Sequence, residues 1–547
     1  MKNISFLISG YLLCLNLAAQ SYGVVNKEVF VTDKTIEAIA QKFDSIYFPL
    51  FVSSFTWIQN EDTAKIREHF NNEVLLYHDK KTINLADSAN LHIQINYKFK
   101  NYAVEDYPLN PPIVWTDEIH PDPSWRLWFQ SLVWLEPYLK SCNSDSVNAA
   151  FFVINDWMTS HLTYPVRNEK FAFDDHAIAE RLMVLVQAYR IYENSPISDT
   201  RFKHRLLLTI LNHIYFVASL EKYSCWHNHA IIFDERLIAA LGILPEFNMQ
   251  YQFLEFAFQR VFEQYRYSFS CEGIHKEHSP CYHIGFTEKL NEVILAAKQQ
   301  GIYIPENILE IQAKANLYVK TIQLFGDNIA IGDCYRSQLF KDSQENEEDN
   351  PTQTNDCVIA KVNKKNLTTE NSILFHQIIY PATGWVFLNN KHQELNFIAQ
   401  SDFFGFSHYQ QDETSFILNK SGYELIIDPG LYSYAKSPVY DFYRSAHAHN
   451  ILIVDDRDFD IDYNNTGLSG ITRFFPEELN GMTEGNIFEM THPHYRNRGI
   501  EIYRQYILPA INVLIIKDII SSNDQHTYKQ LFHLAPGAKV EKRIMNM

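Results

Sequence analysis

Apolar residues recur at helical spacing through about the first 330 residues of the chain. Trp125, Trp128, Phe129 and Leu132 occupy positions i, i+3, i+4 and i+7, directly behind the helix-start signal Asp-Pro-Ser at 122–124. The same spacing predicts further helices over 147–157, 178–189, 202–220, 229–241, 251–262, 288–300 and 307–324. Helices at this interval predict stacked antiparallel pairs in a ring or an arc. We expect no β-strand before about residue 330.

Short β-rich runs bounded by turn residues follow the helical part. Between the two parts, 341–356 contains no hydrophobic residue, which predicts an acidic linker or solvated loop. The runs predict an antiparallel β-sandwich, and whether it is complete at the C-terminus stays open. They cover 372–380, 385–388, 395–399, 415–418, 424–427, 451–454, 513–520 and 528–534.

Composition narrows the possible classes of protein. The 547 residues are 46% hydrophobic and 20% charged, which excludes a disordered acidic polymer. Lys and Arg number 47 against 65 Asp and Glu, a net charge of -18, and this argues against a nucleic-acid-binding surface. Aromatic residues make up 14%, which suits stacking on sugars and also an ordinary large core.

The N-terminal segment predicts export. Met1 and Lys2 precede a mostly apolar stretch at 4–19 that is too short for a comfortable membrane span and ends in small residues. We expect a signal peptide over 1–23, a periplasmic or secreted protein, and no integral membrane span. Leucines, not a small residue, precede Cys14, so we expect no lipid anchor.

Six cysteines remain after removal of that segment, too few for a disulfide framework in a chain of this length. They form no CxxC pair, and buried thiols are the favoured interpretation. The pair that we single out for a possible disulfide is Cys271 with Cys281. The six are Cys142, Cys225, Cys271, Cys281, Cys334 and Cys357.

Four clusters of titratable residues interrupt the apolar patterns, at 227–229, 272–283, 408–412 and 444–450. The first lies at a helix start, where Asn228 could simply cap the helix. The second is expected to be a loop, with Pro280 forcing a bend before Tyr282, and it lacks the HExxH arrangement of metalloproteases. Because each half of the chain supplies two clusters, we expect one site at their interface.

Five short motifs follow one another along the chain. They are Asn228-His229, Ser-Pro-Cys-Tyr-His at 279–283, His408 before Asp412, Ile-Ile-Asp-Pro-Gly at 426–430, and Ala-His-Asn at 448–450. In their order and gaps, over roughly 120–535, they resemble heparinase II/III-type polysaccharide lyases and the related alginate lyases. The resemblance implies a multidomain α+β chain, in which an incomplete (α/α) toroid (24–335) precedes an antiparallel β-sandwich (357–547).

The resemblance implies β-elimination on an anionic, uronate-containing polysaccharide. Such an enzyme must stabilise the enolate that forms when the proton beside the carboxylate is removed. By similarity, Asn228 and His408 would neutralise the carboxylate, and Tyr282 would protonate the leaving oxygen. Either His229 or Tyr282 would be the base, depending on substrate stereochemistry.

Arg181 resembles a substrate-binding arginine of the family by its position. An ion pair on the helix surface with Glu180 or Asp175 is an equally good interpretation. The net charge of -18 favours recognition of carboxylates by a few residues over a sulfate-dense groove. Further candidates for substrate contacts are Tyr434, Arg444 and His447.

The metal site of the family is altered in this sequence. Relatives often hold a structural zinc with His-x-His, an Asp and a later His, ligands that zinc prefers. Asp428 and His449 are present, but Gln410 stands two residues after His408, where the second His is expected. We expect a site that is weakened, rebuilt with His447 or empty. If it is empty, Gln410 would bridge Asp428 and His449.

Two alternatives stay open. One is a glycoside hydrolase on the helical toroid, with acid and base drawn from Asp174, Asp175 and Glu180. The other is a glycan-binding protein without turnover. The sequence leaves the polymer, endo or exo action, and the oligomeric state undecided.

Overall fold

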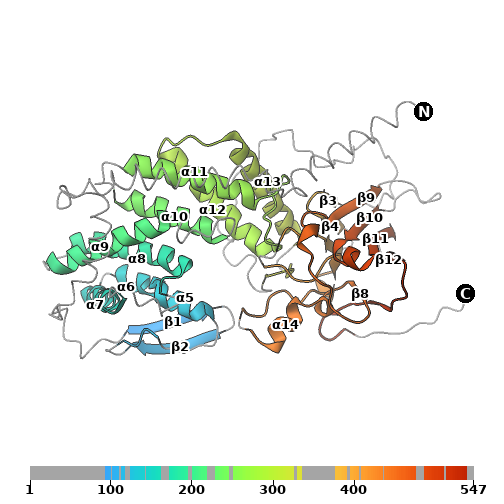
Figure 1. Ribbon diagram of the computed structural model, residues 1–547, viewed down its shortest axis with the longest axis horizontal. Coiled ribbons are helices and arrows are strands. Elements are labelled where there is room, and N and C mark those ends of the chain that lie inside the picture. Colours follow the sequence, from blue (N-terminus) through green and yellow to red (C-terminus); the bar gives the residue numbers. More distant parts are fainter. Residues whose placement is uncertain are drawn as a thin grey trace, which may run out of the picture.

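The structure is a computed structural model, and Figure 1 shows its ribbon. It describes residues 93–99, 102–109, 113–116, 123–141, 143–161, 172–194, 200–218, 228–244, 250–325, 329–334, 376–390, 395–405, 408–434, 436–475, 486–510 and 513–538. The predicted signal peptide, the predicted linker at 341–356, and Cys142, Cys225 and Cys357 lie outside these ranges.

Every helix predicted from the 3.6-residue spacing is present. Their apolar faces form one large core that includes Trp125, Trp157, Leu185 and Phe258, all fully buried. The helices are α5 (Pro123–Ser131), α7 (Ser144–His161), α8 (Asp175–Glu193), α9 (Thr200–Ala218), α10 (Asn228–Ile243), α11 (Gln250–Ser268), α12 (Pro280–Gln299) and α13 (Glu306–Phe325), with the short η3 (Val133–Leu135) and α6 (Glu136–Leu139) between α5 and α7.

Two expectations for the helical half are wrong. A hairpin of β1 (Ile93–Phe99) and β2 (Tyr102–Leu109) precedes the helices, although no strand was expected there. Helix α12 begins at Pro280, so Tyr282 lies in its first turn and not in a loop. Proline is favoured at the first helical position, where its missing N–H costs no hydrogen bond, so Ser279-Pro280 marks a helix start.

The C-terminal half contains two large antiparallel sheets. One has the order β3-β4-β5-β6-β7 and the other β12-β11-β10-β9, while β8 and β13 form a separate pair. The strands are β3 (His376–Tyr380), β4 (Trp385–Asn390), β5 (Leu395–Gln400), β6 (Ser415–Lys420), β7 (Tyr423–Ile426), β8 (Leu452–Val454), β9 (Gly470–Phe475), β10 (Asn486–His492), β11 (Ile500–Ala510), β12 (Val513–Ser522) and β13 (Tyr528–Gln530).

The two large sheets pack face to face, which confirms the sandwich. Val386 and Phe397 of the five-stranded sheet share a core with Phe488 and Tyr506 of the four-stranded sheet. Successive side chains of a strand point to opposite faces, so the neighbouring residues of β4 and β5 face the other way. The five-stranded sheet is therefore covered on both faces.

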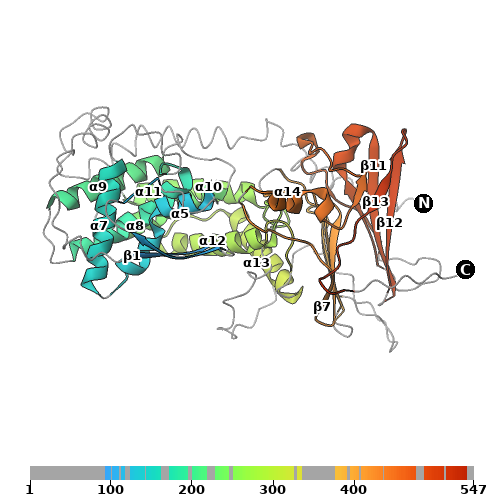
Figure 2. The same cartoon turned by 90° about the horizontal axis from the view of Figure 1, so that it is seen from below.

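The second face of that sheet joins the sandwich to the helical half. Tyr318 and Phe325 of α13 pack against Phe387 of β4, with ring centroids 5.6 and 5.3 Å apart. The Glu272 carboxylate accepts hydrogen bonds from the backbone N–H groups of Ala382 and Thr383. Both views show helices α5 to α12 toward one end of the molecule, the two large sheets at the other, and α13 at their junction (Figure 1, Figure 2).

The helices were also compared with the length and hydropathy of a membrane-spanning segment. Among the described residues, no helix combines the length and the apolar character needed to cross a bilayer.

Candidate active site at the junction of toroid and sandwich

Three helix starts supply the site residues of the helical half. Asp175 opens α8, Asn228 and His229 open α10, and Tyr282 lies in the first turn of α12. In an antiparallel array, every second helix runs in the same direction, so the N-termini of these three helices lie at one end. Partial positive charge at helix N-termini favours an anionic ligand there.

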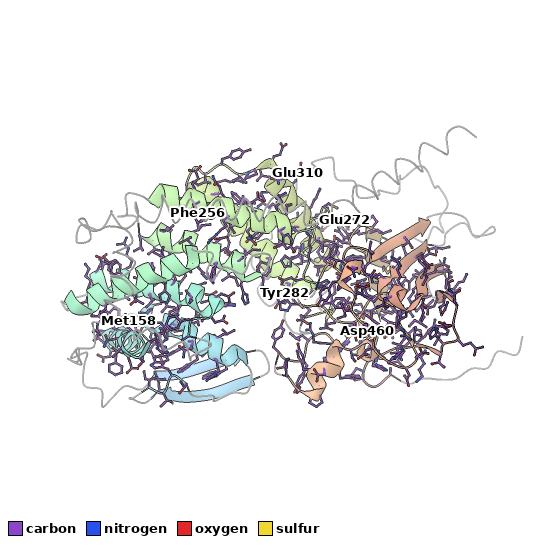
Figure 3. All side chains as sticks on the ribbon, viewed as in Figure 1. Met158, Phe256, Glu272, Tyr282, Glu310 and Asp460 are labelled. Carbon is purple, nitrogen blue, oxygen red and sulfur yellow. A yellow bond between two sulfur atoms is a disulfide. The ribbon has the colours of Figure 1, made fainter. Side chains whose placement is uncertain are left out.

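The sandwich supplies His408, which stacks on Tyr282. Their ring centroids are 4.1 Å apart, and Figure 3 shows Tyr282 where the two halves meet. His408 has a positive φ of 59° in the loop between β5 and β6. Asn228 Nδ2 lies 3.5 Å from His408 Nε2, a long contact that places the amide beside the imidazole. Side chains from both halves therefore converge, as expected.

Tyr434 joins this cluster from the sandwich side. Its hydroxyl lies 2.9 Å from the Tyr282 hydroxyl and 3.3 Å from His408 Nδ1. The Tyr282 hydroxyl therefore contacts a second phenol, that of Tyr434.

Two buried carboxylates of the site were missed in the sequence. Glu277 accepts a hydrogen bond of 3.1 Å from Asn228 Nδ2 and lies 3.7 Å from His408 Nε2. Burial has the largest effect on the pKa of Glu277 and raises it. The charge of His408 and the hydrogen bond from Asn228 lower the pKa, but by less than burial raises it. Asp333 accepts a hydrogen bond of 2.9 Å from His408 Nδ1. Glu277 lay inside a cluster singled out from the sequence, whereas nothing around Asp333 marked it.

His229 is held by a carboxylate of the neighbouring helix. Its Nδ1 lies 2.8 Å from Asp175 Oδ1, and the His176 ring contacts it edge to face at 5.1 Å. Burial alone would lower the pKa of His229, but the hydrogen bond to Asp175 and the charge of Asp175 outweigh it, so the pKa is raised. With Nδ1 donating to Asp175, the neutral ring carries its lone pair on Nε2.

Family models match both halves of the chain. Residues 35–350 match the heparinase II/III N-terminus, and residues 376–545 match the heparinase II/III-like C-terminal domain. The chain belongs to the heparinase II/III-like family. It is a polysaccharide lyase, and its fold is the toroid and β-sandwich of that family.

Solved structures of the family share this fold. A heparinase III crystal structure matches with a TM-score of 0.63 at 17% identity, covering 88% of this chain and 80% of that one. A second heparinase III structure gives 0.55 at 16%, covering 91% and 82%. A heparan sulfate lyase mutant from Pedobacter heparinus gives 0.52 at 14%, covering 92% and 77%. A comparison with curated proteins finds no match.

Arg181 lies inside the helical core and not on a helix surface. The side chain is fully buried, so it forms no surface ion pair with Glu180 or Asp175. Its guanidinium donates to His213 Nε2 at 2.9 Å and to the carbonyl oxygens of Gln130 and Ala172 at 2.6 and 2.7 Å. These bonds hold the guanidinium inside the helical core, where it links three segments of the toroid.

The carboxylates considered for a hydrolase have other roles in the family fold. Asp174 caps α8 by accepting a hydrogen bond from the His176 N–H. Asp175 holds His229, and Glu180 forms an ion pair of 3.0 Å with Arg236. None of these contacts favours an acid and base pair for hydrolysis.

The residues that the sequence suggested for a zinc site have hydrogen-bond partners within the protein. His449 Nδ1 lies 2.8 Å from Asp428 Oδ2, so these two bond each other directly. Gln410 donates to Asp333 Oδ1 at 2.8 Å. The bridge from Gln410 to Asp428 and His449 that the sequence suggested for an empty site is therefore not formed. His447 Nδ1 lies 3.0 Å from Asp458 Oδ1. No group of three or more His, Cys, Asp or Glu residues in the described ranges is arranged to hold a metal ion.

Proposed function

We propose that this lyase cleaves a uronate-containing polysaccharide by β-elimination at the junction of its two halves. The observation that carries the proposal is the contact between Tyr282 of the toroid and His408 of the sandwich, with Asn228 beside them. A carboxylate neutraliser and a phenolic acid must reach the same sugar for this reaction, and His408 contacts both Tyr282 and Asn228.

Asn228 and His408 would bind the uronate carboxylate. Hydrogen bonds to a carboxylate reduce its electron donation and stabilise the enolate that develops when the adjacent proton leaves. In the described structure, Asn228 Nδ2 donates to Glu277, so substrate would meet an amide already oriented by a buried carboxyl group. Burial raises the pKa of Glu277, so this carboxyl group is protonated more readily than an exposed glutamate.

Tyr282 would donate the proton to the leaving glycosidic oxygen, and Tyr434 would support its hydroxyl through the contact of 2.9 Å. The base is either His229 or Tyr282. Asp175 keeps the neutral His229 in the tautomer with a lone pair on Nε2, which is the form that a base requires.

The preferred substrate would be a weakly sulfated uronate polymer, with heparan sulfate as the first to test. Heparinase III and a heparan sulfate lyase share the fold, and the net charge of -18 disfavours a sulfate-dense groove. Arg444, expected to contact substrate, donates to both carboxylate oxygens of Asp333 at 2.8 and 3.1 Å. Its charge is therefore balanced within the protein and adds little to sulfate binding.

Tyr282→Phe tests the assignment of the acid. The substitution keeps the ring that stacks on His408 and removes only the hydroxyl, so we expect kcat to fall by at least about 100-fold while binding survives. The assay follows the ultraviolet absorbance of the new conjugated double bond, with binding measured by calorimetry. Tyr303→Phe, at a position that is 81% exposed, is the matched control. Full turnover by the Tyr282 variant would remove this assignment.

Export is part of the proposal, and a disulfide supports it. Cys281 and Cys334 are bonded, with Cα atoms 5.3 Å apart, so the pairing of Cys281 with Cys271 is wrong. Disulfides persist in oxidising compartments and are rare in the cytosol. Fractionation of the native cells should recover lyase activity from the periplasm or the medium, and recovery from the cytosol alone would contradict export.

We also propose that the sandwich folds without zinc, because Asp428 and His449 already bond each other and Gln410 is bound to Asp333. Incubation with EDTA should leave Tm and activity unchanged. A fall in Tm accompanied by release of stoichiometric zinc would contradict this proposal.

A further inference from the structure

The segment 329–334 runs between the two halves of the site and is buried along its length. It fits closely on two sides. Gly332 has φ +59°, and a Cβ there would overlap the carbonyl oxygen of His278. On the other side, a Cβ at Gly430 would overlap the carbonyl oxygen of Cys334, which accepts a hydrogen bond of 3.1 Å from the Leu431 N–H. The segment is therefore fixed to a loop of the toroid and to a loop of the sandwich.

A disulfide ties this segment to the start of α12. Cys334 follows Asp333 directly, and Cys281 directly precedes Tyr282, although the two cysteines are 53 residues apart in the sequence. Cys334 is fully buried in the core that joins α13 to the sandwich. The covalent bond thus connects the residue next to Asp333 with the residue next to Tyr282.

Asp333 itself organises three side chains of the sandwich. It is 2% exposed and accepts hydrogen bonds from His408 Nδ1, Gln410 Nε2 and Arg444 Nη1 at 2.9, 2.8 and 2.8 Å. Burial raises the pKa of Asp333, but the bond from His408 and the charge of Arg444 outweigh burial, and the net pKa lies below its usual value. Asp333 is therefore ionised, and its charge is balanced by these donors.

We propose that Asp333 is a positioning residue for His408, and that the Cys281–Cys334 disulfide holds Asp333 and Tyr282 in one unit, so that turnover depends on this disulfide. The inference rests on the proposed lyase function. Asp333 fixes the His408 ring with Nδ1 toward itself and Nε2 toward Asn228, the side on which the substrate carboxylate would bind. Nucleophilic and acid–base groups commonly depend on such an orienting partner.

A double-mutant cycle tests the role of Asp333. Asp333→Asn keeps the size of the side chain, removes its charge, and should lower kcat by about 10- to 100-fold. In the His408→Ala background the same substitution should lower kcat no further, because Asp333 acts only through His408. Losses that multiply, or an Asp333→Asn enzyme with wild-type kcat, would overturn the assignment.

Asp234→Asn is the matched control for this cycle. Asp234 is also buried and paired with an arginine, Arg260, but inside the helical core. The Asp234→Asn substitution should lower Tm but leave kcat per folded molecule unchanged, unlike Asp333→Asn. An equal loss of kcat in this control would show that removing a buried ion pair anywhere impairs turnover, and would overturn the specific role of Asp333.

The disulfide is tested by reduction and by substitution. Dithiothreitol reduces Cys281–Cys334 to two thiols and is itself oxidised to a cyclic disulfide. We expect wild-type kcat to fall by about 10-fold or more on reduction and to return on reoxidation. The doubly substituted Cys281→Ser, Cys334→Ser enzyme should have the low kcat under both conditions, and Cys271→Ser, which alters a cysteine outside the disulfide, should behave as wild type.

These outcomes separate the inference from the proposed function. Oxidised wild type that cleaves no uronate polymer refutes the function, whereas active wild type with an equally active double-serine enzyme refutes the role of the disulfide. Circular dichroism shows whether the double-serine enzyme folds. If it does not fold, the role of Asp333 is decided by the Asp333→Asn cycle. The role of the disulfide is then decided by reducing wild-type enzyme whose folding is followed by circular dichroism. If reduction lowers kcat only when the circular dichroism signal of the folded protein is also lost, the positioning role of the disulfide is overturned.

Discussion

Protonation of His229 is controlled by the carboxylates around it. Asp175 contacts its Nδ1 directly, and Asp174 and Glu277 also raise its pKa through their charges. His176, which follows Asp175 in α8, adds an imidazole at 5.1 Å. A base must be unprotonated, so if His229 is the base, activity declines as the pH falls through its raised pKa.

Asp175→Asn distinguishes the two candidate bases. Loss of the Asp175 charge lowers the pKa of His229, so the acid limb of the kcat/KM profile should move to lower pH if His229 is the base. An unmoved limb, with activity retained, would assign the base to Tyr282. Asp145→Asn, an exposed acidic residue in the first turn of α7, is the control.

Arg181 gives a prediction about stability. Removing its side chain leaves the carbonyl groups of Gln130 and Ala172 without their donor and opens a cavity beside Trp157, which the guanidinium covers at 4.0 Å. Arg181→Ala should therefore lower the free energy of unfolding by about 3 kcal/mol. Denaturant unfolding measures this. A large rise in KM with unchanged stability would instead support substrate binding.

At the scale of elements, hydrophobic periodicity predicted the long helices because each buries a continuous apolar face. It missed β11, whose inward positions are Ile500, Ile502, Arg504, Tyr506 and Leu508, all buried. Arg504 breaks the apolar alternation in the sequence. It is tolerated because its partner in the register of β12, Asp518, accepts its hydrogen bonds, a pairing that only the folded sheet reveals.

The close fit of segment 329–334 gives a prediction at the same scale. Gly332→Ala places a methyl group against the backbone of His278 at a positive φ, so it should lower both Tm and kcat, with a cost of about 1–3 kcal/mol in stability. Gly285→Ala is the control, since a Cβ at this position of α12 meets no atom within 4 Å. Its Tm should be unchanged or higher. Equal behaviour of the two variants would contradict the fit.

For the whole molecule, the sequence motifs predicted that both halves contribute to one site, and Asn228, Tyr282 and His408 do converge. The carboxylates that organise them were not predictable in the same way. Asp333 is 75 residues from His408, and its role arises only when segment 329–334 is enclosed between the halves. Likewise, the burial of Arg181 follows from how the helices pack. Its position in the sequence relative to the family's motifs does not reveal that packing.

The central claim is that this shared site eliminates across a uronate linkage. Its most direct test is to incubate the oxidised enzyme with heparan sulfate, then with other uronate polymers, and to follow ultraviolet absorbance and product mass together. We predict rising absorbance and products that each carry an unsaturated uronate at the new non-reducing end. Products heavier by one water, with new reducing ends and no added absorbance, would contradict the claim, as would binding of every polymer without any product.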